Sequence, residues 1–374
     1  MRTELIQLDG VADAARITHA AQILRSGGLV AFPTETVYAL GADARNPEAL
    51  ARLAKVKGKL DGKNYSLLVG SMLQAEQLAG GAGSGGGGLS RTARKLARLY
   101  WPGMLTLVVP RAGGGNVGLR IPQHPVARSL IAQCGFPVAA PNATLRTHKG
   151  NEHVGRSESP SYLLCDGLSA AQVRTAFDGR IDLVLEGGAQ PKGKLSTVVE
   201  VSDQSVSVQR EGAIAEVDVL LAAVPTILFI CTGNTCRSPM AAGLWRAALA
   251  DFYKPLAPEM RILSAGTNAT PGQPAHPHSI AAMKEIGFDI SDHRATMLTP
   301  ELVDSADWIF TMTRAHRDSI IEFMPSCANR VHLIAKEEDE IAEPGGRSLE
   351  RYRQCRDKLA RCLLHVLTTI ERLG

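Results

Sequence analysis

Cysteines are few in this sequence and are not arranged in pairs. Seven of them are spread over 374 residues, with no CxxC pair and no regular spacing, which excludes a disulfide framework and predicts a reducing compartment. No basic segment followed by an apolar core opens the chain, so we expect no signal peptide. The longest apolar stretch, residues 219–230, contains a proline and is too short to span a bilayer. We therefore predict a cytoplasmic protein without a membrane partner.

A strong excess of charge of either sign is also absent. The formal net charge is +4 at pH 7, which permits anionic ligands such as nucleotides or phosphorylated proteins and does not demand nucleic acid. Hydrophobic residues make up 45% of the chain and charged residues 21%, which is typical of a folded protein. The length predicts about two domains.

Two different patterns divide the chain. Residues 1–216 predict a mixed α/β domain, in which residues 80–88 form a glycine-rich tract. No Gly-Lys-Ser/Thr follows this tract, so a flexible surface insertion is the preferred interpretation and a phosphate cradle is the alternative. After a linker at 217–225, residues 226–374 alternate strands with helices, which predicts a doubly wound parallel sheet.

The clearest chemical motif is the segment 231–238, Cys-Thr-Gly-Asn-Thr-Cys-Arg-Ser. It follows the apolar strand 226–230 and precedes a helix that begins near Pro239. Backbone N–H groups converge at such a helix N-terminus and make an anion site. The positive field there favours a thiolate, so Cys231 is the predicted nucleophile. The alternative is an inert core cysteine.

The other side chains of this loop suit the same chemistry. Arg237 carries a planar fork that can hold two phosphoryl oxygens, and Ser238 can donate a hydrogen bond to the sulfur. Gly233 lets the backbone approach the phosphate closely, and Asn234 can hold the loop's shape through side-chain bonds to the backbone. The remaining members of the predicted phosphate-binding and specificity set are Thr232, Thr235 and Cys236.

Further segments accompany the loop in the second domain. They are 264–267 (Ser-Ala-Gly-Thr), 292–295 (Asp-His-Arg-Ala), 306–312 (Ala-Asp-Trp-Ile-Phe-Thr-Met) and 352–353 (Tyr-Arg). With them, residues 226–374 resemble the low-molecular-weight protein tyrosine phosphatase family. The resemblance implies a phosphocysteine intermediate on Cys231, a phosphoryl group cradled by Arg237, a phosphorylated protein substrate and no cofactor.

Three positions refine what the resemblance implies. The family's acid, an aspartate in an Asp-Pro pair, aligns with Glu343-Pro344, and Asp339 is the less favoured alternative. Thr235 stands where tyrosine-specific members more often have a branched apolar residue, and the loop resembles the bacterial branch that acts on phosphoarginine. Cys236 matches a cysteine that in the family can form a reversible disulfide with the nucleophile. We expect protein-arginine phosphatase activity, with protein-tyrosine phosphatase activity as the alternative.

Short segments of the first domain also follow a known order. They are 33–38 (Pro-Thr-Glu-Thr-Val-Tyr), 101–107 (Trp-Pro-Gly-Met-Leu-Thr-Leu), 118–122 (Gly-Leu-Arg-Ile-Pro), 139–141 (Ala-Ala-Pro), 193–199 (Gly-Lys-Leu-Ser-Thr-Val-Val) and 210–214 (Arg-Glu-Gly-Ala-Ile). They resemble the YrdC-like threonylcarbamoyl-AMP synthase family. The resemblance implies an open, twisted α/β sheet and an enzyme that joins threonine, bicarbonate and ATP for tRNA modification, with tRNA-modification proteins as partners.

The same resemblance implies which residues contact the ligands. The residues implied to hold threonine are Thr34, Arg120 and Ser196. The residues implied to hold the ATP phosphates, together with Mg²⁺, are Lys57, Lys59 and Arg210. The residues at the family's Ser-x-Asn segment are Asn142 and Thr144.

Departures from the family leave alternatives open for the first domain. Its Lys-x-Arg is here Lys57-Gly58-Lys59, which loses a bidentate donor, and Ser-x-Asn is replaced at residues 142–144. These changes favour a domain that keeps the fold with altered ligand contacts, fused to an active phosphatase. A bifunctional enzyme that also makes threonylcarbamoyl-AMP is one alternative, and a regulatory module that binds anions or nucleotides with little catalysis is another. No metal site is predicted, because His276 and His278 flank a proline without a third ligand.

Overall fold

The structure is a computed structural model that divides into two compact units, Met1–Leu221 and Ala222–Gly374. It describes residues 2–9, 13–58, 65–80, 88–143, 169–188, 193–202, 205–252, 260–335, 339–346 and 348–373. Helix α7 (Glu216–Ala223) occupies most of the segment expected as a linker, 217–225. Residues 81–87 of the glycine-rich tract lie outside the described residues.

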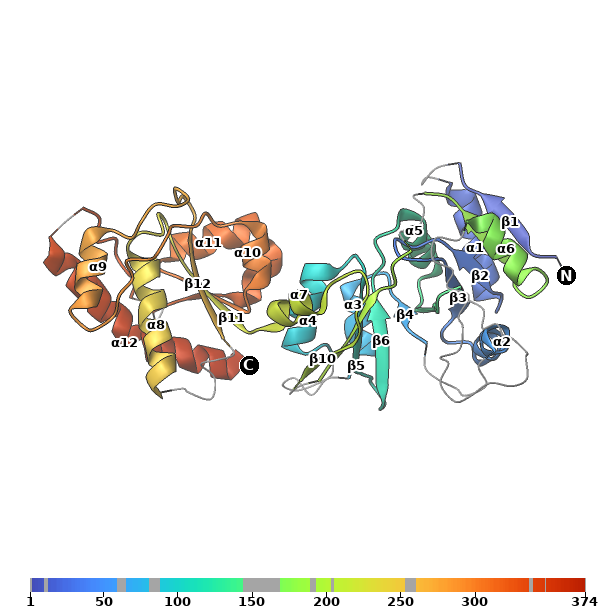
Figure 1. The fold of residues 1–374 in the computed structure, drawn as a ribbon, viewed down its shortest axis with the longest axis horizontal. Helices are drawn as coiled ribbons and strands as arrows, with labels where there is room; N and C mark the ends of the chain where they lie inside the picture. The colour runs from blue at the N-terminus through green and yellow to red at the C-terminus, as the bar shows by residue number, and fades with distance from the viewer. Residues whose placement is uncertain are drawn as a thin grey trace, which may run out of the picture. The chain divides into compact units, whose positions relative to one another are not determined.

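The first unit contains a mixed sheet (Figure 1). Its strands are β1 (Glu4–Gln7), β2 (Val30–Phe32), β3 (Ala39–Asp43), β4 (Leu67–Leu68), β5 (Leu105–Pro110), β6 (Asn116–Arg120), β7 (Val138–Ala139), β8 (Leu183–Glu186), β9 (Thr197–Val201) and β10 (Val206–Arg210). Within the described residues they lie in the order β1-β8-β2-β3-β7-β4-β6-β5-β9-β10. β5 pairs parallel with β9 and antiparallel with β6, so the predicted mixed α/β class is confirmed.

Among the described residues, six helices of the first unit lie between its strands in the sequence. They are α1 (Ala14–Arg25), α2 (Pro47–Lys57), α3 (Met72–Leu78), α4 (Arg91–Tyr100), α5 (Pro125–Cys134) and α6 (Ala170–Phe177). Residues of α1 and α5 share one buried cluster with β2, β7 and β8. Hydrophobic burial against the sheet therefore fixes both helices.

The second unit is a parallel sheet between two layers of helices. Its strands are β11 (Thr226–Cys231), β12 (Arg261–Gly266), β13 (Trp308–Thr311) and β14 (Val331–Leu333). Its helices are α8 (Arg237–Phe252), α9 (Pro277–Lys284), α10 (Pro300–Ser305), α11 (Arg314–Phe323), the 3₁₀-helix η2 (Pro325–Arg330) and α12 (Leu349–Leu373). The described strands lie in the order β12-β11-β13-β14, and every pair is parallel.

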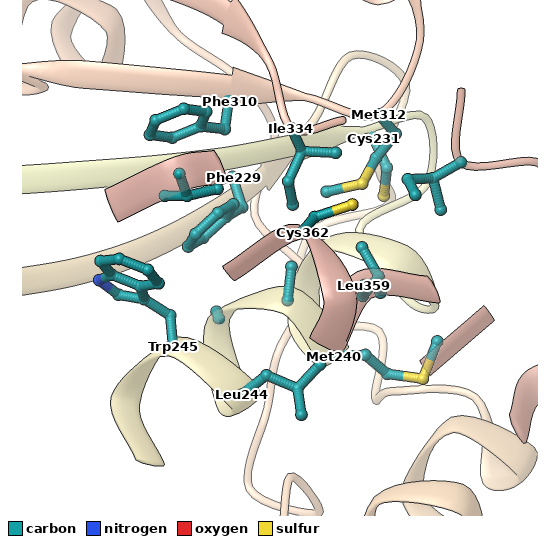
Figure 2. Close-up of a cluster of buried hydrophobic side chains, with 14 of the residues drawn as sticks. Phe229, Cys231, Met240, Leu244, Trp245, Phe310, Met312, Ile334, Leu359 and Cys362 are labelled. Atoms are coloured by element: carbon teal, nitrogen blue, oxygen red, sulfur yellow. The ribbon is translucent and has the colours of Figure 1, made fainter. Parts of the chain in front are cut away.

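Alternate residues of β11 face opposite layers of this unit. Ile227 and Phe229 lie in a buried cluster with side chains of α8 and α12 (Figure 2). Leu228 and Ile230 lie in a second cluster with side chains of α10 and α11. A strand buried on both faces in this way is typical of a doubly wound sheet, and the predicted architecture is confirmed.

Local capping sets the ends of helices that matter below. Asn46 precedes α2 and accepts a hydrogen bond from the Glu48 N–H at 2.9 Å, and Gly58 ends the helix with a φ of 62°. Thr313 precedes α11, and its Oγ1 accepts from the His316 N–H at 3.3 Å. Among the described residues, no helix combines the length and the apolar character needed to cross a bilayer.

Candidate active site

Cys231 is the last residue of β11, and its loop ends where α8 begins. The residue is 1% exposed and belongs to the buried cluster that also contains Met312 (Figure 2). Its Sγ lies 3.0 Å from Oγ of Ser238 in the first turn of α8. That hydroxyl also accepts from the Asn234 amide at 2.8 Å, so its own proton can be donated to the sulfur or, over the longer distance of 3.5 Å, to the Ala265 carbonyl.

Asn234 fixes the shape of the loop. Its φ is 54°, in the left-handed region that asparagine tolerates better than most residues. Besides Ser238, its amide donates to Oγ of Ser264 at 2.9 Å, and its Oδ1 accepts from the Thr296 N–H at 2.8 Å. Its backbone carbonyl accepts from Nε2 of His293 at 2.7 Å. The bonds to Ser264, His293 and Thr296 tie the loop to residues 30, 59 and 62 positions further along the chain.

Two glycines near the loop differ in what surrounds them. A Cβ on Gly266, at the end of β12, would lie 2.3 Å from the carbonyl oxygen of Thr232. A Cβ on Gly233 would meet only Thr235 Oγ1, at 3.7 Å, among the described residues. The loop thus packs against Gly266, while the space at Gly233 is open, as close approach of a phosphate would require.

Arg237 is buried and held from several sides. Its Nη1 donates to the Ile341 carbonyl at 3.1 Å, and its Nη2 donates to Oγ1 of Thr232 at 3.3 Å. Nη2 also forms an ion pair with Glu343. Among the described residues its buried Nε has no partner. Nε and Nη2 form the edge of a guanidinium that matches two phosphoryl oxygens, so one prong of this fork is available and the other is occupied by Glu343.

A buried tyrosine connects the loop to the segment that carries Glu343. The hydroxyl of Tyr352 lies 3.7 Å from Sγ of Cys236 and accepts from the Gly346 N–H at 3.3 Å. Its ring stacks on His276 with centroids 4.8 Å apart. Burial raises the pKa of the Cys236 thiol. Thr235 is half-buried beside it, with its Oγ1 3.6 Å from the Cys236 sulfur.

Asp339, the alternative acid, lies in a different environment. Its carboxylate forms an exposed ion pair with Lys358 of α12. In the described residues, the carboxylate that reaches Arg237 is that of Glu343.

In the first unit, Arg120 carries a buried guanidinium at the end of β6. Its Nε donates to the Gly103 carbonyl at 2.9 Å, and its Nη2 donates to Oε1 of Glu35 at 2.7 Å and to Oγ1 of Thr36 at 3.1 Å. Glu35 also accepts from the His124 N–H at 3.0 Å. Although burial opposes ionisation, the Arg120 charge holds the pKa of Glu35 below its usual value.

Arg210 lies in the same polar cluster. Its Nη2 donates to the carbonyl of Ser196 at 2.8 Å and to the Ser196 hydroxyl at 3.2 Å, and that hydroxyl accepts from Thr106 Oγ1 at 3.0 Å. Burial, and then the charge of Arg120, lower the pKa of Arg210.

The remaining ligand residues expected in the first unit fall into three groups. Thr34 is buried, and its Oγ1 lies 2.8 Å from Thr36 Oγ1, which ties it to the Arg120 contacts. Lys57 donates from Nζ to the Asn142 carbonyl at 2.7 Å. The predicted residues outside the described part of the chain are Lys59 and Thr144.

The sequence motifs did not predict contacts between residues that are distant along the chain. Neither Glu35 nor His316 was predicted to be a site residue, although Glu35 lies inside the segment 33–38. His316 Nε2 is 2.9 Å from Thr232 Oγ1, and its Nδ1 is 2.7 Å from Thr313 Oγ1. His316 lies outside the quoted segments, and a single histidine of this kind gives no signal in one sequence. Glu35 could have been found, because an acidic residue between two threonines after a strand forms a polar cluster.

Two family models match the chain. Residues 22–158 match Sua5_yciO_yrdC, described as telomere recombination. Residues 226–373 match the low molecular weight phosphotyrosine protein phosphatase. The two matches fall in different compact units.

Curated relatives divide the chain in the same way. The threonylcarbamoyl-AMP synthase of Bacillus subtilis is 34% identical over 211 residues, which are 54% of this chain and 54% of that protein. The putative threonylcarbamoyl-AMP synthase of Mycobacterium tuberculosis is 31% identical over 208 residues, 53% of this chain and 85% of that protein. The protein-arginine-phosphatase of Geobacillus stearothermophilus is 36% identical over 152 residues, 40% of this chain and 93% of that protein.

The overlap is partial for some synthases. This chain spans 54%, about half, of the length of the Bacillus subtilis synthase and of the Pyrococcus abyssi synthase. The similarity is therefore to a part of those proteins.

Proposed function

Since the chain belongs to the low molecular weight phosphotyrosine protein phosphatase family in residues 226–373 and to the Sua5–YciO–YrdC family in residues 22–158, we propose that its C-terminal unit is a phosphoprotein phosphatase. The observation that carries the proposal is the 3.0 Å contact between Cys231 Sγ and Ser238 Oγ, in a loop that also supplies Arg237. A sulfur nucleophile, a hydroxyl that stabilises it and a guanidinium fork are the groups that displacement at phosphorus requires.

The reaction proceeds in two displacements. In the first, the Cys231 thiolate attacks phosphorus, the bond from phosphorus to the leaving group breaks, and the leaving group takes a proton from the Glu343 carboxyl. In the second, water attacks the phosphocysteine, gives a proton to the Glu343 carboxylate, and the sulfur–phosphorus bond breaks. Inorganic phosphate and the Cys231 thiolate are released, while Arg237 and the loop N–H groups stabilise the charge on the phosphoryl oxygens.

Glu343 is the proposed acid and base because its carboxylate already contacts Arg237. A phosphoryl group bound to the Arg237 fork would displace the Glu343 carboxylate from Nη2. The displaced carboxylate would then lie next to the phosphoryl group. The side chain is 44% exposed, so it can move aside at little cost. A glutamate reaches one methylene further than the family's aspartate, which lets the same carboxylate act from a shifted backbone.

We propose protein phosphoarginine as the substrate and phosphotyrosine as the alternative. Thr235 supports this choice, because a small hydroxyl leaves room for a guanidinium and can hydrogen-bond to it. The residue is half-buried in the loop, and its carbonyl accepts from the His276 N–H at 2.9 Å. The relative from Geobacillus stearothermophilus is named a protein-arginine-phosphatase.

The test compares phosphoarginine and phosphotyrosine peptides of one sequence on the full chain. We expect the wild type to prefer phosphoarginine, and Thr235→Ile to shift the ratio of the two kcat/KM values toward phosphotyrosine by roughly tenfold or more. Cys231→Ser is the control and should turn over neither peptide. Equal turnover of the two peptides by the wild type would contradict the substrate, and equal ratios for wild type and Thr235→Ile would contradict the role of Thr235. Turnover by Cys231→Ser would contradict the mechanism.

A second candidate function belongs to the first unit, and the guanidinium of Arg210, whose Nη2 is held at Ser196 by two hydrogen bonds, favours it. Arg210 suits an anion such as the phosphates of ATP, with threonine contacted by Thr34, Arg120 and Ser196. Mg²⁺ is the metal that would accompany the ATP phosphates. We propose that this unit binds ATP and that threonylcarbamoyl-AMP synthesis is its candidate activity.

The test incubates the full chain with ATP, threonine and bicarbonate, and measures nucleotide binding and product formation. Formation of threonylcarbamoyl-AMP supports a bifunctional enzyme, and Arg210→Ala should abolish it. Nucleotide binding without product supports an anion-binding regulatory module instead. Absence of nucleotide binding contradicts both. A cytoplasmic location with phosphoproteins and tRNA-modification proteins as partners is part of the same proposal.

A further inference from the structure

His316, on α11, bridges two threonine hydroxyls. Its Nδ1 lies 2.7 Å from Oγ1 of Thr313, and its Nε2 lies 2.9 Å from Oγ1 of Thr232. The backbone N–H of His316 donates to the same Thr313 oxygen at 3.3 Å. The imidazole therefore connects the start of α11 to the nucleophile loop, which lies 84 residues earlier.

The chain of contacts continues to the phosphate-binding arginine. Thr232 Oγ1 accepts from Nη2 of Arg237 at 3.3 Å. Thr232 is an exposed residue, so its side chain would rotate freely without a partner, and fixing one rotamer costs conformational entropy. The contact with His316 supplies that partner.

The direction of the hydrogen bonds follows from what each group can do. Guanidinium N–H groups only donate, so Thr232 Oγ1 accepts from Arg237. Thr313 Oγ1 accepts from the His316 N–H, which leaves its own proton for Nδ1. A neutral His316 then carries its proton on Nε2 and donates it to Thr232. The Thr232 proton is left over and can be donated to a phosphoryl oxygen on the Arg237 fork.

The surroundings favour this neutral form. Burial and then the charge of Arg237 lower the pKa of His316, while the carboxylates of Glu343 and Glu340 act in the opposite direction. In the part of the chain that the structure describes, these are the charged groups that act on the imidazole, from the nucleophile loop and from the segment 339–346. Near neutral pH the imidazole therefore adds no positive charge to the cradle.

We propose that His316 is a positioning residue of the phosphatase, which holds the Thr232 hydroxyl so that this hydroxyl and the Arg237 fork point at the same phosphoryl oxygens. The inference rests on the proposed phosphatase function. His316 does not itself touch the phosphoryl group, so its effect passes through Thr232.

The experiment measures the affinity of the full chain for inorganic phosphate by calorimetry at pH 7, together with its inhibition of aryl phosphate hydrolysis. We expect His316→Ala and Thr232→Val each to weaken phosphate binding about tenfold, the scale of a lost hydrogen bond near a charge. The double variant should be no weaker than either single variant. His316→Gln keeps a donor for Thr232 and should stay within about threefold of the wild type.

Matched controls separate positioning from a general disturbance of α11. Ser319→Ala changes an exposed residue of the same helix and should leave phosphate affinity unchanged. Losses that multiply in the double variant would show that His316 acts independently of Thr232 and would overturn the proposal. So would a His316→Gln variant as weak as His316→Ala. If His316→Ala fails to fold, Thr232→Val and His316→Gln still decide the question.

A pH series gives a second readout. Acidification through the lowered pKa of His316 protonates the imidazole in the wild type and adds a charge beside Arg237, whereas the glutamine variant cannot respond. The ratio of the phosphate dissociation constants, His316→Gln over wild type, should therefore rise as the pH falls through that pKa, and a ratio that falls instead would contradict the contact chain. An enzyme that hydrolyses no phosphoester would defeat the proposed function, while phosphate affinities would still decide the role of His316.

Discussion

An arginine meets a glutamate in each unit, but the two pairs differ in the exposure of the carboxylate. Arg120 and Glu35 are 8% and 11% exposed, whereas Arg237 and Glu343 are 4% and 44% exposed. The guanidiniums are equally buried. Glu35 also accepts a backbone N–H from His124, so it belongs to the frame of the first unit, while Glu343 lies at the surface and can leave.

This difference shows that the presence of an ion pair does not by itself decide whether an arginine can bind a ligand. Arg120 uses its Nε on Gly103 and its Nη2 on Glu35, so its fork is already taken by a buried anion. Arg237 has a buried Nε with no partner in the described residues and an exchangeable partner on Nη2. The phosphatase unit thus offers its arginine to an external anion more readily than the first unit does.

The largest effect that would test this comparison is on stability. Glu35→Ala leaves the buried Arg120 charge without its partner, which typically costs about 3–5 kcal/mol. Glu343→Ala removes a half-exposed carboxylate that water can replace at Arg237, so it should cost less than Glu35→Ala. Hydrogen exchange of the full chain, resolved by peptide, measures opening of each unit separately. Equal costs for the two variants would remove the distinction between a structural pair and an exchangeable one.

The second prediction concerns the Arg237 fork. Arg237→Lys keeps a positive charge and loses the planar edge formed by Nε and Nη2. We expect kcat/KM on an aryl phosphate to fall by roughly 10²–10³-fold, the cost of one preorganised donor. Arg353→Lys is the matched control, because Arg353 forms surface ion pairs with Glu285 and Glu350. A small loss in the Arg237 variant would show that charge alone, without the fork, suffices.

The two sites also differ in how far the sequence could predict them. The nucleophile loop is one continuous segment between a strand and a helix, so its residues and their geometry are tied together locally. The Arg120–Glu35 contact spans 85 residues, and the Thr232–His316 contact spans 84. Such pairs depend on strand order and register, which a single sequence leaves undetermined.

The same reasoning applies to secondary structure. The alternation of strands and helices after residue 226 predicted the doubly wound sheet, because strands buried on both faces are nearly all apolar. Helix α7 was harder to predict. Its Val217, Leu220 and Leu221 stay exposed, so no amphipathic pattern distinguishes it from a connecting segment.

A third prediction addresses the exchangeable carboxylate directly. Glu343→Gln removes the proton donor and should lower kcat by roughly tenfold or more. It also removes the charge that competes for Arg237, so inorganic phosphate should bind more tightly than it does to the wild type. Asp339→Asn is the matched control, since that carboxylate pairs with Lys358, and it should change neither quantity.

The two readouts on Glu343→Gln have separate meanings. An unchanged kcat would remove the acid assignment. Weaker phosphate binding would show that Glu343 does not compete with phosphate for Arg237, and would make this pair resemble the Arg120–Glu35 pair after all.

The smallest effect is on the pH dependence of stability. Burial lowers the pKa of His293, with the charges of Arg246 and Arg294 acting in the same direction and the hydrogen bond to Asn234 opposing them. The unfolded chain therefore binds a proton at a higher pH than the folded unit, so stability is lost as the pH falls from the ordinary 6.5 through the lowered value. His293→Gln should flatten this part of the curve.

Glu35 provides the contrast in the first unit. Its pKa lies below the ordinary value of 4.5, so its contribution to stability is complete above pH 4.5 and is lost only at lower pH. Peptide-resolved hydrogen exchange between pH 7 and pH 5 should therefore show the segments around Asn234 opening more readily while those around Arg120 stay protected. Equal loss of protection in both units over this range would contradict the assignment, because the carboxylate of Glu35 remains ionised throughout it.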